Sequence, residues 1–332
     1  MKAKAFLLRA ACVAGGLLAA LALAELGLRV RGGRPLEPPW YPGDHVPATS
    51  MTVHGVVDST IGWKLAPGAI DDETSDFHVG YSIGADGFRT TTSDAGPDAP
   101  LVVFVGDSFT FGSGIADGET FVERVAAALG VRPLNLGMAG FGVDQMWRTL
   151  VRYGLEREPQ LVVATFVDDD LTRSCTAFRY RNGWVAKPTY TLAGGELVAM
   201  DEAHRPAAPV RWFLQHSRLA GVLRKLSWHT PTGGARWRLN RALFAAMRDA
   251  CRDADVPLVC VRIPDRDRWA PSGFFEREFR GLEIPLFDLG GVHVADARAL
   301  FFAKDPHLDA AGHAVLASGL AEFLRARHLL SQ

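Results

Sequence analysis

The sequence predicts an α/β protein whose main domain is a three-layer α/β/α sandwich around a mostly parallel sheet of about five strands. Two observations predict it. Several short runs are apolar along their whole length, such as LVVFV at 101–105, which is typical of strands buried on both faces. These runs alternate with segments whose apolar residues recur at helical spacing, the pattern of a parallel sheet with crossover helices.

The expected elements follow one another from residue 101 onward. Gly130 would end the first helix and Asp309 would cap the last one. Because parallel strands end at one edge of the sheet, the loops after them are expected to meet there. Strands are expected at 101–106, 132–138, 161–167, 257–263 and 284–289, and helices at 119–129, 143–156, 235–254 and 309–330.

Two segments do not follow this alternation. Residues 51–100 carry short strand-like pieces and read as an N-terminal β extension of the domain. Residues 171–233 read as an insertion near the carboxyl edge of the sheet. Within it, KPTYTLAGGELVAM predicts a hairpin that turns at Gly194 and Gly195.

The first 31 residues predict an export signal or a membrane anchor, because basic residues precede an apolar run at 10–24. An uncleaved anchor is favoured. The run at 22–24 also offers a small-x-small cleavage pattern, so a cleaved signal stays open, as does a buried helix. Residues 32–50 are rich in Pro and Gly and are expected to be a linker. The body is therefore expected outside the cytoplasm, either membrane-anchored or secreted.

Composition excludes some partners. The 332 residues have a formal net charge of -1, so no basic field would attract nucleic acid. Cys251 and Cys260 are expected to be small buried hydrophobes, with a disulfide between them as an alternative. No Cys/His spacing suggests zinc, and the aspartates of FVDDDL are expected to form a solvated turn, so neither metal nor cofactor is expected. The oligomeric state cannot be predicted.

Ser108 is the first candidate for chemistry. It lies in GDSFTFGSG, where the strand at 101–106 gives way to a turn and a helix. This segment lacks the lysine and the glycine spacing of a phosphate-binding loop, and it lacks the second glycine of a GxSxG nucleophile elbow. Two alternatives remain, namely a serine that attacks a substrate and a serine that only caps the helix.

A serine nucleophile needs a base and a group that orients the base. His307, in KDPHLDAAGH, lies in a loop expected at the same sheet edge, and Asp305 could accept its second N–H. His313 is the rival, but it falls inside the last predicted helix. Gly140, in NLGMAGFG, could offer a backbone N–H to an oxyanion.

Taken in order, FVGDSFTFGSG, NLGMAGFG and DPHLDAAGH resemble the SGNH/GDSL hydrolase family, whose fold is flavodoxin-like. The segments AELGLR, GWKLAPG and GADGFRTT also resemble a membrane-anchored, exported subgroup. The resemblance implies a domain over 51–332, with Ser108 as nucleophile, His307 as base and Asp305 as its partner. It implies an oxyanion hole made by Ser108, Gly140 and an Asn of a third block.

Two departures from the family pattern stand out. Asp169 occupies the place of the third-block Asn, and an ionised carboxylate would repel an oxyanion. Its place in the oxyanion hole is therefore doubtful. Either the Asp169 carboxyl is protonated, or its side chain turns away, or another group donates to the oxyanion. The family usually has Asp three residues before the His, where this chain has Lys304, so Asp305 gives a shorter Asp-x-His.

The expected function is that of an exported, membrane-tethered serine esterase or deacylase acting on acyl esters of an envelope glycan or a lipid through an acyl-enzyme. One alternative is an O-acyltransferase that passes an acetyl group to an extracytoplasmic polysaccharide. A second alternative is a weakly active or inactive glycan-binding protein, since Asp169 replaces the Asn. The expected partners are an acylated carbohydrate or lipid ester and the membrane.

Overall fold

The computed structural model describes residues 2–30, 39–40, 55–176, 178–180, 184–199, 217–219 and 233–330. Most of the predicted linker at 32–50 and much of the predicted insertion at 171–233 lie outside the described residues.

The core of the fold is one five-stranded sheet in the order β14-β13-β8-β6-β7, with every pair of neighbours parallel. This confirms the predicted fold class, and each strand lies inside a predicted run. The strands are β6 (Leu101–Val105), β7 (Arg132–Asn135), β8 (Leu161–Phe166), β13 (Leu258–Arg262) and β14 (Leu286–Asp288).

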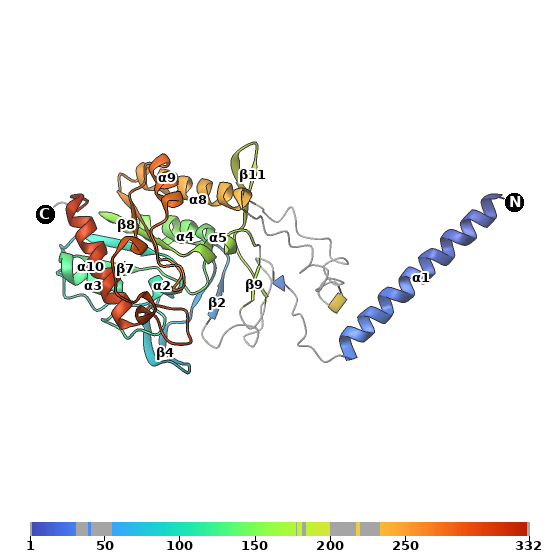
Figure 1. Cartoon of the computed structure of the whole chain (residues 1–332), viewed down its shortest axis with the longest axis horizontal. Coiled ribbons are helices and arrows are strands. Elements are labelled where there is room, and N and C mark those ends of the chain that lie inside the picture. The colour runs from blue at the N-terminus through green and yellow to red at the C-terminus, as the bar shows by residue number, and fades with distance from the viewer. Residues whose placement is uncertain are drawn as a thin grey trace.

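Helices cover both faces of this sheet. Because alternate side chains of each strand point to opposite sides, each strand packs against both helical layers. Val102 and Phe104 pack with α3 (Phe121–Leu129) and α10 (Ala310–Ala326), which lie together in Figure 1. Val103 and Val105 face the other layer, which contains α4 (Val143–Thr149), α8 (Gly234–Asp253) and α9 (Gly273–Gly281). These two apolar clusters hold the three layers together.

Caps fix the ends of several helices. Gly130 ends α3 with a φ of 67°, and the Asp309 carboxylate caps α10 by accepting from Gly312 N–H at 2.9 Å, as the sequence predicts. The segment 143–156 is not one α-helix as predicted. It leaves α geometry after Thr149 and continues as the π-helix η2 (Leu150–Gly154) and the 3-10 helix η3 (Leu155–Arg157).

Small hairpins lie outside the five-stranded sheet. The pairs β2 (Gly55–Asp58) with β3 (Gly62–Leu65) and β4 (Gly68–Glu73) with β5 (His78–Ile83) match the strand-like pieces expected within 51–100. The predicted turn at Gly194 and Gly195 is confirmed: both have positive φ, between β11 (Tyr190–Ala193) and β12 (Glu196–Ala199). A further sheet contains β1 (Pro39–Trp40), β9 (Phe178–Tyr180) and β10 (Trp184–Ala186).

The N-terminal helix α1 covers Lys2–Val30 (Figure 1). Within the described part of the chain, no helix combines the length and the apolar character needed to cross a membrane. The transmembrane segment expected within 1–31 stays a prediction, as do the cleaved signal and the domain boundaries. Cys251 and Cys260 are both buried and free, as expected without the disulfide.

Candidate active site

Ser108 lies three residues after the end of β6, the strand between β8 and β7, and is the first residue of the short helix α2 (Ser108–Phe111). The cap of α2 is Asp107, whose Oδ1 accepts from Phe109 N–H at 3.0 Å. Ser108 is therefore not the cap, and its Oγ is left for another contact. The turn needs Gly106, because a Cβ there would lie 2.9 Å from the Thr165 carbonyl oxygen.

His307 supplies that contact. The Ser108 Oγ lies 2.7 Å from His307 Nε2, and His307 Nδ1 lies 2.5 Å from Asp305 Oδ1. With Nδ1 protonated, the ring donates to Asp305 and accepts from Ser108. Ser108 is 7% exposed, and the side chains of His307 and Asp305 are 18% and 24% exposed, so the chain of contacts opens to solvent at one end. The structure thus brings these three predicted residues together, despite the shorter Asp-x-His spacing.

His313, the rival base, is placed away from this chemistry. It is 1% exposed within α10, and its Nδ1 accepts from the Phe121 N–H at 2.9 Å. Burial lowers the pKa of His313 to about 3, so the ring is neutral at physiological pH. Its role is to satisfy a buried helix terminus.

Gly140 lies in the turn that follows β7, with a φ of 77° that favours glycine. Asn135 ties this turn to α2: its Oδ1 accepts from Gly137 N–H and its Nδ2 donates to the Thr110 carbonyl, both at 3.0 Å. Among the described residues, the backbone N–H groups of Ser108 and Gly140 bond to no acceptor. The oxyanion role expected of these two N–H groups stays a prediction.

The aspartates of FVDDDL form the first turn of a helix, α5 (Asp168–Arg173), and not the solvated turn that the sequence suggests. Asp170 is fully buried and caps that helix, since its Oδ2 accepts from Val167 N–H at 2.9 Å. Asp169 has a side chain that is 65% exposed, and its Oδ2 lies 2.8 Å from Arg173 Nη2. The carboxylate of Asp169 is therefore bound to a guanidinium.

Arg173 links the three blocks. Its Nη1 donates to Asp107 Oδ2 at 2.9 Å, to Asp170 Oδ1 at 2.6 Å and to the Phe141 carbonyl at 3.3 Å. The Asp107 oxygen that it binds also lies 3.4 Å from the Ser108 Oγ. Burial raises the pKa of Asp170 well above its usual range, and Asp107 adds to this while Arg173 opposes it. The guanidinium is thus the cation that holds two buried carboxyl groups beside the serine.

No protein-family model matches the chain, and no curated protein matches it. Among solved structures it is similar to a GDSL-like lipase from Bacteroides thetaiotaomicron (10% identity, TM-score 0.40, 71% of this chain and 93% of that one). It is also similar to a lipase/acylhydrolase from Enterococcus faecalis, with 14% identity and a TM-score of 0.39 over 69% of this chain and 96% of that one. A third similar structure is a psychrotrophic esterase from a Pseudoalteromonas species, with 10% identity and a TM-score of 0.40 over 69% of this chain and 98% of that one.

Two residues of the β extension support this candidate site, and neither was predicted from the sequence. Arg89, which is 3% exposed, donates to the carbonyls of Phe111, Gly112 and Ile115 and pairs with Asp117. It therefore fixes the loop that follows the serine helix. Asp76 accepts from the backbone of the loop that carries Asp305 and His307. Arg89 lies in GADGFRTT, one of the segments that resemble the membrane-anchored, exported subgroup.

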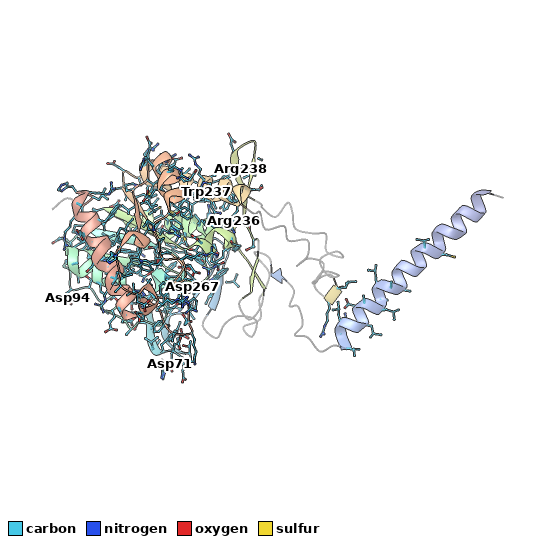
Figure 2. All side chains as sticks on the ribbon, viewed as in Figure 1. Asp71, Asp94, Arg236, Trp237, Arg238 and Asp267 are labelled. Atoms are coloured by element: carbon cyan, nitrogen blue, oxygen red, sulfur yellow. The ribbon has the colours of Figure 1, made fainter. Side chains whose placement is uncertain are left out.

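A cavity of about 390 Å³ lies against α5, at the carboxyl edge of the sheet. Asp168 and Arg236 form its polar wall, and Trp237 and Phe274 form an aromatic wall. Figure 2 labels Arg236 and Trp237 at the start of α8. Tyr190 packs on Trp147 and is 9% exposed. Among the described residues, no cluster of His, Cys, Asp or Glu could hold a metal ion.

Proposed function

We propose that this protein is a serine esterase or deacylase that cleaves acyl esters through an acyl-enzyme. The observation that carries the proposal is the chain of contacts from the Ser108 Oγ to His307 Nε2 at 2.7 Å, and from His307 Nδ1 to Asp305 at 2.5 Å. A hydroxyl, an imidazole and a carboxylate in this order are the parts that serine acyl transfer requires.

In the proposed mechanism, the Ser108 Oγ attacks the carbonyl carbon of the ester, and His307 Nε2 takes the hydroxyl proton. Asp305 holds the protonated Nδ1 and stabilises the imidazolium that forms. His307 then gives its proton to the leaving alkoxide, and the acyl group stays on Ser108. A water molecule, deprotonated by His307, attacks the acyl-enzyme and releases the acid.

The oxyanion would be bound by the backbone N–H groups of Ser108 and Gly140. Asp169 is not needed as a donor in this proposal, because its carboxylate is bound to Arg173. A preorganised donor of this kind contributes about 3–4 kcal/mol to the barrier reduction. Two backbone donors would therefore support catalysis without the third-block amide.

We propose further that the ester belongs to an envelope glycan or a lipid, and that the domain works outside the cytoplasm. The basic residues ahead of the apolar run at 10–24 support export. The cavity beside α5 supports a sugar-sized group, because an aromatic wall next to a carboxylate and a guanidinium suits a hydroxylated ring. The same acyl-enzyme would serve an O-acyltransferase if a sugar hydroxyl replaced water as the acceptor.

The test is hydrolysis of p-nitrophenyl acetate by the wild type and by the Ser108→Ala and His307→Ala variants. We expect both variants to lose at least about 10³-fold in kcat. Release of free acetate, or its transfer to an added glycan, separates hydrolysis from transfer. An inert wild type that no fluorophosphonate labels at Ser108, but that binds glycans, would replace the proposal with a binding role.

A further inference from the structure

Asp76 lies in the turn between β4 and β5, far from the candidate triad in sequence. Its Oδ2 accepts two successive backbone N–H groups, from Lys304 at 2.6 Å and from Asp305 at 2.7 Å. Asp305 is the orienting partner of His307, and Lys304 is the residue directly before it. One carboxylate oxygen from the β extension therefore holds the start of the loop that carries the base.

At this end of the loop Arg266 Nη1 also donates to the carbonyls of Phe302 and Ala303, at 3.4 and 3.5 Å, but Asp76 is the group that binds Asp305 itself. Asp305 Oδ1 accepts from both the backbone N–H of His307 at 2.9 Å and the ring Nδ1 at 2.5 Å. The direction of the Asp305 carboxylate thus depends on the Asp305 backbone, whose N–H is bound by Asp76. The side chain of Asp305 is 24% exposed, so core packing does not fix it.

The turn that presents Asp76 is itself ordered. Thr74 Oγ1 accepts from the N–H groups of Asp76 and Phe77, at 3.2 and 3.3 Å. The Phe77 ring packs on Phe302 with 5.0 Å between the ring centroids, and Phe302 N–H donates to the His307 carbonyl at 3.1 Å. The hairpin therefore contacts the base loop at two places.

The same hairpin also contacts the loop after the serine. Tyr81 Oη accepts from the Gly114 N–H at 2.8 Å and donates to Asp72 Oδ2 at 2.9 Å. The Ser82 N–H donates to Asp117, the carboxylate that pairs with Arg89. The β4–β5 hairpin therefore spans the nucleophile side and the base side of the site.

We propose that Asp76 is a positioning residue, which sets the orientation of Asp305 and His307 toward Ser108 by accepting the Lys304 and Asp305 N–H groups. This inference rests on the function proposed above. A positioning role of Asp76 makes the β extension part of the catalytic machinery. It also explains how a loop with Asp-x-His spacing keeps the contacts from Asp305 to His307 and from His307 to Ser108. The two N–H groups also lower the pKa of Asp76, because they bind its charged form.

The experiment compares Asp76→Ala with Asp76→Asn, because the Asn carbonyl can still accept the two N–H groups. On p-nitrophenyl acetate we expect Asp76→Ala to lower kcat by about 10- to 100-fold with KM nearly unchanged, since a small misplacement of a catalytic group costs about that much. We expect Asp76→Asn to stay within about 3-fold of the wild type. The rate of fluorophosphonate labelling at Ser108 should fall in parallel for Asp76→Ala only.

The matched control is Asp71→Ala. Asp71 is on the same hairpin, 75% exposed, and pairs only with His78 among the described residues (Figure 2). We expect Asp71→Ala to behave as wild type. The inference is overturned if Asp76→Ala keeps full kcat while Ser108→Ala is inactive, or if Asp76→Asn loses as much as Asp76→Ala. A wild-type rate in Ser108→Ala would instead overturn the proposed function itself.

Discussion

Arg173 donates a hydrogen bond of 2.9 Å to Asp107, the residue directly before the candidate nucleophile Ser108. The same nitrogen atom also bonds to Asp170 and to the Phe141 carbonyl, so one guanidinium joins the three loops of the site. The guanidinium lies one turn beyond Asp169 on α5, and its two Nη atoms contact the carboxylates of Asp107, Asp169 and Asp170.

Arg173→Met should therefore damage both stability and activity. It would leave Asp107 and Asp170 facing each other without a cation, and loss of one partner of a buried ion pair costs about 3–5 kcal/mol of unfolding free energy. We expect kcat/KM to fall at least about 10-fold, because Asp107 caps the helix of Ser108. Chemical denaturation and kinetics measure both effects.

Adding Asp170→Asn to Arg173→Met is the control, since it removes one of the two uncompensated carboxylates. We expect the double variant to regain part of the lost stability. Equal stability of Arg173→Met and the wild type would show that the cluster contributes little to folding.

Asp169→Asn should change catalysis only slightly. The Asp169 side chain is 65% exposed and pairs with Arg173, and exposed pairs of this kind contribute little. We expect kcat on p-nitrophenyl acetate within about 3-fold of the wild type, with Asp71→Asn, at a side chain that is 75% exposed, as the control. A gain of about 100-fold, which is roughly the effect of one added oxyanion donor, would mean that the carboxylate limits turnover.

Much of this architecture could be predicted because its signals are local. Wholly apolar strands and helical periodicity predict the sheet, and the topology of parallel strands predicts that Ser108 and His307 meet at one edge. The contacts of Asp76 could not be predicted, since a hydrogen bond to Asp305 spans 229 residues and depends on how two loops pack. Likewise, nothing in DDDLTR by itself says that Asp170 is buried and Asp169 exposed.

Some misses did have a signal. Ser272 followed by GFFEREFRG carries the cap and the apolar spacing of a helix, and Ser272 Oγ does cap α9 by accepting from Phe275 N–H. Arg173, four residues after Asp169, has the spacing of a helical ion pair, which would have suggested α5. The π-helix after Thr149 has no such signal, because its sequence has ordinary helical spacing.

The ion pair between Lys187 and Asp144 gives a prediction on pH. Both side chains are fully buried, and the pair joins the segment before β11 to α4. Burial raises the pKa of Asp144 from its usual value of 3.8 to about 6, although Lys187 opposes the rise. Because the folded-state pKa is the higher one, the contribution of Asp144 to stability is fully present below about pH 4 and is lost as the pH rises through about 6.

Lys187→Met removes the cation that opposes the rise in the pKa of Asp144. The loss of the stabilising contribution of Asp144 should therefore extend to higher pH. We expect the variant to be destabilised by about 3–5 kcal/mol at pH 8 and by clearly less at pH 5. Urea denaturation at the two pH values measures this, and a further Asp144→Asn change should remove the pH dependence. An equal deficit at both pH values would show that the Asp144 carboxyl is not its source.

Alanine variants of His313 and His307 should separate a structural role from a catalytic role. His313→Ala leaves the buried Phe121 N–H without its acceptor, which costs about 1–3 kcal/mol, and a cavity adds to this loss. His307→Ala should instead abolish hydrolysis at nearly wild-type stability, because its ring is partly exposed and, among the described residues, is hydrogen-bonded only to Ser108 and Asp305. Thermal unfolding and p-nitrophenyl acetate kinetics should rank the two variants in opposite order.

The sign of the pH effect at His313 follows from its pKa of about 3, which burial lowers from 6.5. A depressed pKa means that the neutral ring stabilises the fold above pH 6.5, and that this contribution is lost as the pH falls toward 3. His313→Asn keeps an acceptor for the Phe121 N–H but cannot take up the proton. We therefore expect its stability to decline less than that of the wild type between pH 6.5 and 4, and a parallel decline would assign the acid sensitivity to other groups.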